Sequence, residues 1–199
     1  VLGSDNGLYY SLNDGGQWER FENFPTVPVR DLKFSEGQHD LVVASHGRGM
    51  FVLDDIRPLE QFSSQVANEA FHLFEPGPAI EFRHWLYDAR WETDYTAYRP
   101  PNPDDGAYID FYVGAASPQN AGNVEFRVTG ADGRVISTFS APARAGVGRY
   151  VWDMRYADST SLDFIKKPPA GPGPPGHDVD PNQGPLVPPG EYQLEAQYG

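Results

Sequence analysis

The sequence predicts an all-β protein, and three observations support this prediction. The 199 residues include 21 glycines and 19 prolines, which favour many turns and few long helices. Apolar and polar residues alternate over several short runs, as they do in half-buried strands. One short strand also recurs, because residues 49–52 (GMFV) match residues 7–10 (GLYY) at an offset of 42 positions.

This repeat predicts the architecture of residues 1–57. Short strands and glycine-rich turns that recur about every 40 residues are typical of the four-stranded blades of a β-propeller. We therefore expect residues 1–57 to form the last one or two blades, incomplete in this chain. Within them, residues 29–34, 41–45 and 50–53 read as the inner, second and third strands of the final blade. A chance match between two hairpins is the alternative.

A polar turn, SLNDGGQW, lies between the two copies of the repeat at residues 11–18. It fits the Asp-box pattern, Ser/Thr-x-Asp-x-Gly-x-x-Trp, through Ser11, Gly15 and Trp18, with Asn13 in the place of the aspartate. A hydroxyl and a short amide can bond turn amides, glycine can take a positive φ, and the indole can pack beneath the turn. We assign the box a structural role. An ordinary Asn-Asp-Gly-Gly turn beside a core tryptophan is the alternative.

The remainder of the chain divides into a linker and a second β domain. Residues 58–78 form the predicted helical linker: Pro58 suits a first helical turn, apolar residues follow at helical spacing up to residue 68, and Pro76 and Pro78 end the segment. Residues 79–199 are predicted to form a β-sandwich from strands at 107–113, 124–128, 135–139, 150–156 and 192–198. A Pro/Gly-rich stretch at 168–190 is predicted to be an extended loop.

Several of these segments resemble one protein family. Residues 41–61 (LVVASHGRGMFVLDDIRPLEQ), with an Asp-box hairpin upstream, are similar to the last blade of bacterial sortilin-like (VPS10-type) BNR-repeat propellers, often labelled glycosyl hydrolases. Residues 100–113, 148–156 and 188–197 resemble the immunoglobulin-like domain that follows the propeller in that family. The resemblance implies an exported protein, extracellular or periplasmic, with a signal peptide and further blades upstream. Asn13 and the absence of cysteine depart from the family pattern, so a receptor role is not carried over.

The candidate site residues lie mostly in the final blade. His46 and Arg48, in the glycine-flanked connection at 45–49, are predicted ligand contacts, since arginine pairs with carboxylates or phosphates. The alternative for Arg48 is a structural ion pair with Asp54 or Asp55, and for His46 a backbone hydrogen bond between blades. Asp54 is a candidate catalytic carboxylate whose partner would come from an absent blade. The residues that resemble the start of a calcium loop are Asp178, Asp180 and Asn182, with a solvated acidic loop as the alternative.

The composition argues against several classes of binding partner. A net charge of −13, with no compensating basic cluster, repels nucleic acid. No run reaches the roughly 18 apolar residues of a membrane span, and no cofactor motif is visible. We therefore expect recognition of a glycan or of a peptide or protein, without a cofactor. The alternative function is a glycoside hydrolase whose catalytic carboxylates lie mostly in upstream blades.

Overall fold

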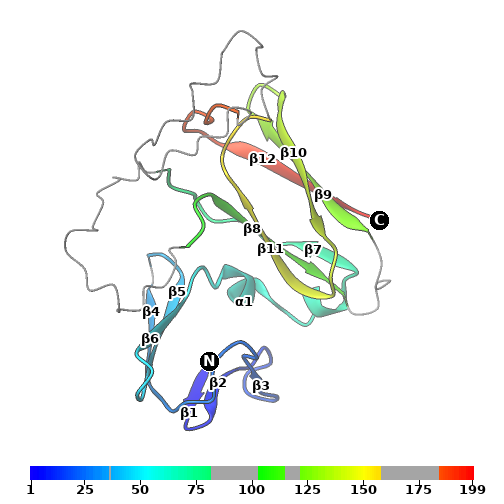
Figure 1. Ribbon diagram of the computed structural model, residues 1–199. Coiled ribbons are helices and arrows are strands. Elements are labelled where there is room, and N and C mark those ends of the chain that lie inside the picture. Colours follow the sequence, from blue (N-terminus) through cyan, green and yellow to red (C-terminus); the bar gives the residue numbers. More distant parts are fainter. Residues whose placement is uncertain (36, 82–102, 115–121, 158–183) are drawn as a thin grey trace, which may run out of the picture. The chain divides into compact units, whose positions relative to one another are not determined.

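The computed structural model describes residues 1–35, 37–81, 103–114, 122–157 and 184–199 (Figure 1). Within these residues the chain is all-β, as predicted, with four antiparallel three-stranded sheets and almost no helix. Two compact units are present. One contains residues 1–77, 109–121 and 143–149, and the other contains residues 78–108, 122–142 and 150–199.

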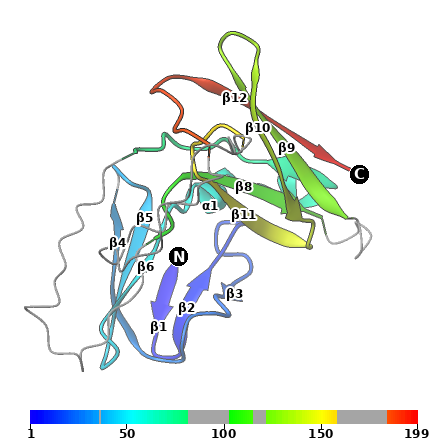
Figure 2. The ribbon, with the colours of Figure 1, turned by 45° about the horizontal axis from the view of Figure 1, so that its top comes forward.

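Two of the sheets lie wholly in the first unit, and in both of them strands that are neighbours in sequence are neighbours in space (Figure 2). Antiparallel strands joined by short turns need no crossover, so such sheets follow directly from the alternating segments. The predicted strands at 29–34, 41–45 and 50–53 are confirmed, each within one residue at either end. The strands of the two sheets are β1 (Leu2–Ser4), β2 (Gly7–Tyr10) and β3 (Glu19–Arg20), and then β4 (Val29–Ser35), β5 (Asp40–Ser45) and β6 (Met50–Leu53).

Both of these sheets contribute to one hydrophobic core. Leu41 and Val43 of β5 are almost fully buried with Leu8 of β2, while the ring of Phe24 meets the ring of Phe51 edge-on at 4.8 Å. The remaining members of this core and the residues packed against it are Val27, Ile56, Phe21, Val29, Leu32 and Leu59. A core drawn from two sheets accounts for the burial of the apolar side of β5, because a single sheet would leave that side in water.

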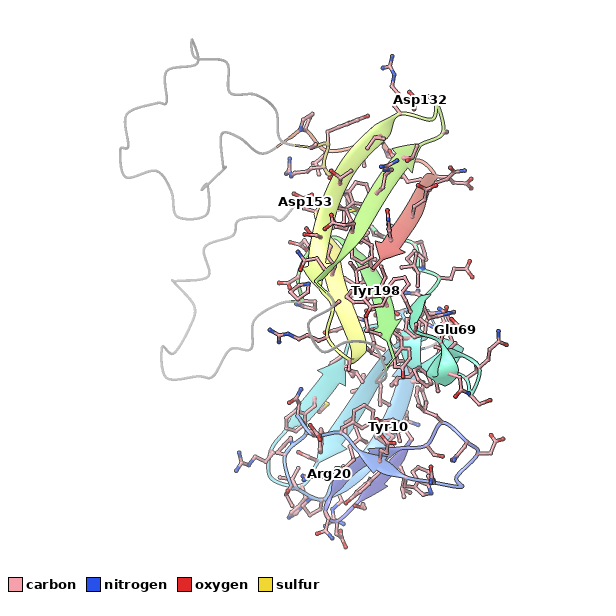
Figure 3. All side chains as sticks on the ribbon, turned by 90° about the vertical axis from the view of Figure 1, so that its right-hand side faces the viewer. Tyr10, Arg20, Glu69, Asp132, Asp153 and Tyr198 are labelled. Carbon is pink, nitrogen blue, oxygen red and sulfur yellow. The ribbon has the colours of Figure 1, made fainter. Side chains whose placement is uncertain are left out.

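Strands β1 and β4 approach each other closely where Gly3 lies. A Cβ atom at Gly3 would overlap the Val29 side chain, so only glycine fits there. The register of the first sheet places Tyr9 opposite Arg20 and Tyr10 opposite Glu19, and Figure 3 labels Tyr10 and Arg20 on these neighbouring strands.

The predicted linker helix is shorter than its apolar spacing indicated. Helix α1 covers only Arg57–Gln61, and a separate 3-10 turn follows at Val66–Asn68, so the prediction of helix up to residue 68 was wrong. The helix stops because Phe62 is extended, with its ring against those of Phe74 and Tyr112. Packing of this aromatic side chain therefore outweighs the helical spacing of residues 57–68.

The six remaining strands form the other two sheets, in the orders β11-β8-β7 and β10-β9-β12. The predicted strands at 107–113 and 192–198 are confirmed, and those at 124–128 and 135–139 are confirmed and extend further. The predicted strand at 150–156 instead ends at Trp152, because Met154 has a φ of 56° and cannot continue a ladder. The bounds are β7 (Phe71–Leu73), β8 (Ala107–Val113), β9 (Asn123–Gly130), β10 (Val135–Pro142), β11 (Gly146–Trp152) and β12 (Tyr192–Tyr198).

The second unit is organised around strand β9. Its alternate residues Val124, Phe126 and Val128 are buried, as the period-2 pattern predicted. Phe126, Phe139 and Tyr150 stack, with the last two ring centroids 4.4 Å apart. The β9–β10 hairpin turns at the predicted Asp-Gly pair, where Gly133 has a φ of 78°, and Asp132 is labelled at its tip in Figure 3.

Candidate functional site

The connection between β5 and β6 presents the two predicted ligand contacts to solvent. Both His46 and Arg48 are exposed. The main chain around them is held by three hydrogen bonds: the amide and the hydroxyl of Ser45 donate to the carbonyl oxygen of Gly49 at 3.0 and 2.8 Å, and the amide of His46 donates to that of Pro28 at 2.8 Å. The loop backbone is thus anchored while its two polar side chains remain accessible.

The predicted alternative for Arg48, an ion pair with Asp54 or Asp55, is not formed among the described residues. Asp55 instead pairs with Arg57, whose Nη1 lies 2.6 Å from its Oδ2. Asp54 directly follows β6, and its main-chain oxygen accepts a hydrogen bond from the guanidinium of Arg149. The alternative for His46, a hydrogen bond to backbone between blades, stays a prediction, because the bond that its main-chain amide donates reaches Pro28, next to β4 of the same sheet.

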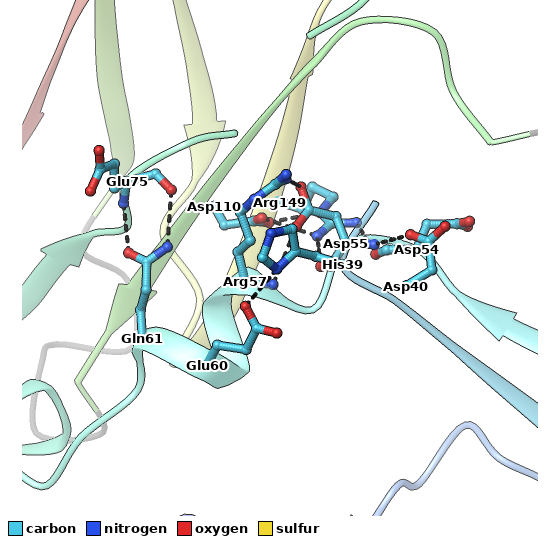
Figure 4. A network of polar contacts seen from close by, with 10 residues as sticks. All are labelled: His39, Asp40, Asp54, Asp55, Arg57, Glu60, Gln61, Glu75, Asp110 and Arg149. Carbon is cyan, nitrogen blue, oxygen red and sulfur yellow. Dashed lines mark hydrogen bonds and ion pairs between the residues drawn. The ribbon is translucent and has the colours of Figure 1, made fainter. Parts of the chain in front are cut away.

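The most connected polar feature of the first unit surrounds the Asp54-Asp55 pair (Figure 4). We call it the arginine–carboxylate cluster and define it as Asp40, Asp54, Asp55, Arg57, Asp110 and Arg149. Its members come from the ends of β5 and β6, from α1, from β8 and from β11.

Arg149 is the centre of this cluster. Its Nε and Nη2 donate to the two carboxylate oxygens of Asp110 at 2.7 and 3.0 Å, which is the bidentate geometry that a guanidinium forms best. Its Nη1 and Nη2 also donate to the main-chain oxygens of Asp54 at 2.9 Å and Asp55 at 2.7 Å. One side chain therefore links β8 to the segment that follows β6, although these segments are far apart in sequence.

Asp55 adopts a left-handed conformation, with a φ of 51°. Aspartate tolerates this region better than most residues because its short side chain can bond local amides. Here its carboxylate accepts from the amide of Arg57 at 3.2 Å, while its own amide donates to Asp40 Oδ1 at 3.0 Å. This turn redirects the chain from β6 into α1.

Burial raises the pKa of two carboxyl groups in the cluster. Desolvation raises the pKa of Asp110 above its ordinary range, although the hydrogen bonds and charge of Arg149 oppose this. The pKa of Asp54 is also raised, first by desolvation and then by the neighbouring Asp40 carboxylate, with Arg149 acting in the opposite direction. Asp54 is therefore more readily protonated than an exposed aspartate, which is the property a general acid requires.

Two histidine–glutamate pairs lie in the same unit. His39 Nδ1 lies 2.8 Å from Glu60 Oε2, and His72 Nδ1 lies 2.8 Å from Glu69 Oε2. In the part of the chain that the structure describes, no three histidine, aspartate or glutamate side chains gather as a metal site requires. The suggested calcium ligands Asp178, Asp180 and Asn182 lie outside the described residues.

The turn at residues 11–18 forms the hydrogen bonds predicted from its sequence. Ser11 Oγ accepts from the amide of Gly15 at 2.8 Å, and Asn13 Oδ1 accepts from the amide of Gln17 at 2.8 Å. Gly15 has the expected positive φ, 85°, and lies beside the Trp18 indole. Trp18 is nevertheless 46% exposed, so the described residues cover only part of its ring.

Asp54 was predicted from the sequence as a site residue, whereas Asp110 and Arg149 were not. Asp110 is the one buried charged residue among those described, and it interrupts the apolar strand 107–113. A charge at a buried strand position, with an arginine on another strand, was the available signal.

No protein-family model, curated protein or solved structure matches this chain. No helix within the described ranges has the length and apolar character to cross a membrane.

Proposed function

We propose that residues 1–57 are blades of a BNR-repeat, sortilin-like propeller and that the chain serves recognition of a glycan or of a peptide or protein. In this proposal, residues 79–199 form the accompanying immunoglobulin-like sandwich. The protein acts outside the cytoplasm, in keeping with the family resemblance.

The hydrogen bonding of the box turn is the observation that carries this proposal. Ser11 and Asn13 bond the turn amides through their side chains, although asparagine replaces the aspartate of the pattern. The turn joins β2 to β3, and β4 begins the next sheet. In a propeller, this order corresponds to the second, third and fourth strands of one blade followed by the first three of the next.

The exposed connection between β5 and β6 supports recognition. An exposed arginine on a backbone held by three hydrogen bonds loses little main-chain freedom when it binds a ligand. Guanidinium groups bind carboxylates bidentately, so the favoured ligands are acidic glycans and the carboxylates of peptides.

Calorimetric titration of the chain tests this proposal. Acidic oligosaccharides and peptides with free carboxyl termini are titrated into the wild type, Arg48→Gln and a control, Arg134→Gln. The control removes the same charge at a residue whose side chain is 87% exposed in the other unit. We expect Arg48→Gln to weaken binding by about tenfold or more, roughly 1.4 kcal/mol, and the control to match the wild type. Failure of both ligand classes to bind, or equal binding by both variants, would contradict the proposal.

A glycoside hydrolase is the second candidate, favoured by the raised pKa of Asp54 beside Asp40. Glycosidic bonds are cleaved by two carboxyl groups, one of which donates a proton to the leaving group, and a raised pKa favours that role. Release of a chromogenic aglycone, with Asp54→Asn compared against the wild type, measures this activity directly. Hydrolysis that is lost in Asp54→Asn while binding is retained would favour the enzyme over the binding protein.

A further inference from the structure

Strand β4 contains a bulge near its beginning. Its register with β5 pairs Val29 with Ser45 but Asp31 with Ala44, so two steps along β4 match one step along β5. Arg30 is therefore an extra residue, with no residue opposite it on β5. Bulges of this kind redirect side chains, and they are common beside active sites.

The bulge turns Arg30 away from the hydrophobic core. Val29 and Leu32 both pack against that core, with two residues between them in place of the single residue of a regular strand. The neighbouring Asp31 carboxylate accepts a hydrogen bond from the amide of Leu32 at 2.9 Å, which holds it against its own main chain. The Arg30 side chain is 58% exposed and lies 3.8 Å from the carboxylate of Asp5, which is 84% exposed. An ion pair this exposed contributes little stability, so a ligand can replace Asp5 beside Arg30.

Arg30 lies at the same end of the sheet as the connection that carries Arg48. This connection begins at Ser45, which is opposite Val29, the residue before Arg30. Both arginines are exposed, in a chain whose net charge is −13. This end of the sheet therefore presents two cationic side chains although the protein as a whole is acidic.

We propose that Arg30 is a second ligand contact beside Arg48, and that the ligand is an acidic oligosaccharide with a carboxylate on at least two of its sugar units. Arg48 lies in the turn from β5 to β6, one to two strand spacings from β4, or roughly 5–10 Å. Guanidinium groups repel each other, and each can form two parallel hydrogen bonds with one carboxylate, so each binds a carboxylate of its own. This inference rests on the proposed function and narrows its ligand class.

The outer edge of β4 favours a glycan over a peptide. An extended peptide along this edge would have to pair with the β4 main chain, and bulges and charged side chains are the usual means by which edge strands prevent such pairing. An oligosaccharide binds through its hydroxyl and carboxylate groups and needs no main-chain ladder. One arginine on a strand and another on an anchored turn therefore suit the repeated carboxylates of an acidic polysaccharide.

Calorimetric titration of the full chain with galacturonate and its short oligomers tests this inference. The monomer carries one carboxylate and the oligomers carry one per unit, so the gain in affinity with length measures the second contact. Arg30→Gln removes that contact. Lys33→Gln is the matched control, because it removes the same charge from an exposed position farther along β4. We expect the wild type and the control to bind the oligomers about tenfold or more tightly than the monomer, and Arg30→Gln to lose this gain while its affinity for the monomer changes by less than about twofold.

A second variant, Asp5→Asn, should produce a gain in place of a loss. It removes the exposed carboxylate beside Arg30, so binding of the oligomers should tighten by about two- to fivefold. A residue that only supported the bulge would not produce this gain. Circular dichroism checks that each variant keeps its strand content.

The possible results separate this inference from the proposed function. Oligomer binding by Arg30→Gln that equals the wild type, an equal loss in Lys33→Gln, or weaker binding in Asp5→Asn would overturn the role of Arg30. Binding of peptides with free carboxyl termini, without binding of any galacturonate oligomer, would overturn the glycan assignment while the proposed function stands. If neither class of ligand binds, the proposed function fails as well.

Discussion

Replacement of Arg149 by methionine is the sharpest test of the arginine–carboxylate cluster. The change removes four hydrogen bonds, two to the Asp110 carboxylate and two to main-chain oxygens. The Asp110 side chain is only 6% exposed, so its charge would remain in the interior without its partner. Breaking a buried ion pair from one side costs about 3–5 kcal/mol. Arg149 is 31% exposed, so water replaces part of the loss, and we expect about 3 kcal/mol.

Urea unfolding followed by circular dichroism measures this loss. With an m-value of about 2 kcal/mol per molar urea, 3 kcal/mol lowers the midpoint by about 1.5 M. Arg134→Met is the matched control, because its side chain is 87% exposed and lies 3.7 Å from Asp132, and we expect it to change stability by less than about 0.5 kcal/mol.

The pH dependence separates a lost charge pair from lost packing. Burial already raises the pKa of Asp110, and removal of Arg149 raises it further. A group whose pKa is higher in the folded than in the unfolded protein adds stability at low pH and loses it as pH rises through the folded value. The deficit of Arg149→Met should therefore shrink as pH falls from neutrality. A deficit that is independent of pH, or one no larger than that of Arg134→Met, would refute the reasoning.

Three further predictions concern other positions. Ser11→Ala removes the acceptor of a turn amide and should lower the free energy of unfolding by about 1 kcal/mol, as measured by thermal unfolding. Gly106 has a φ of 149°, and in Gly106→Ala the new Cβ would overlap a main-chain oxygen of β11, so we expect the free energy of unfolding to fall by about 2 kcal/mol or more. Gly133 has open space around it, so Gly133→Ala should lower the free energy of unfolding by only about 1 kcal/mol. Urea unfolding midpoints compare the two variants. The pKa of Tyr10 is raised to about 12 by burial and by the hydrogen bond from its hydroxyl to Glu19. Ultraviolet titration should therefore show one tyrosine that ionises at higher pH than the others, and its pKa should fall in Glu19→Gln. The free energy of unfolding should decrease as pH rises from 10 to 12, because the unfolded chain then loses the Tyr10 proton before the folded protein does.

The sequence by itself determined the local structure of this protein. Alternation placed the strands, Asp132-Gly133 placed a hairpin, and the box pattern predicted which side chains of residues 11–18 would bond the turn. These features depend on neighbours within a few residues, so the physical cause and the pattern lie in the same short segment.

Only the tertiary structure decided the arginine–carboxylate cluster and the end of α1. Arg149 bonds the carbonyl oxygen of Asp55 across 94 sequence positions and the Asp110 carboxylate across 39. The ring of Phe62 ends the helix by packing on side chains that come later in the chain. Such contacts leave no periodic signal, because their partners are chosen by the way the sheets pack and not by spacing along the sequence.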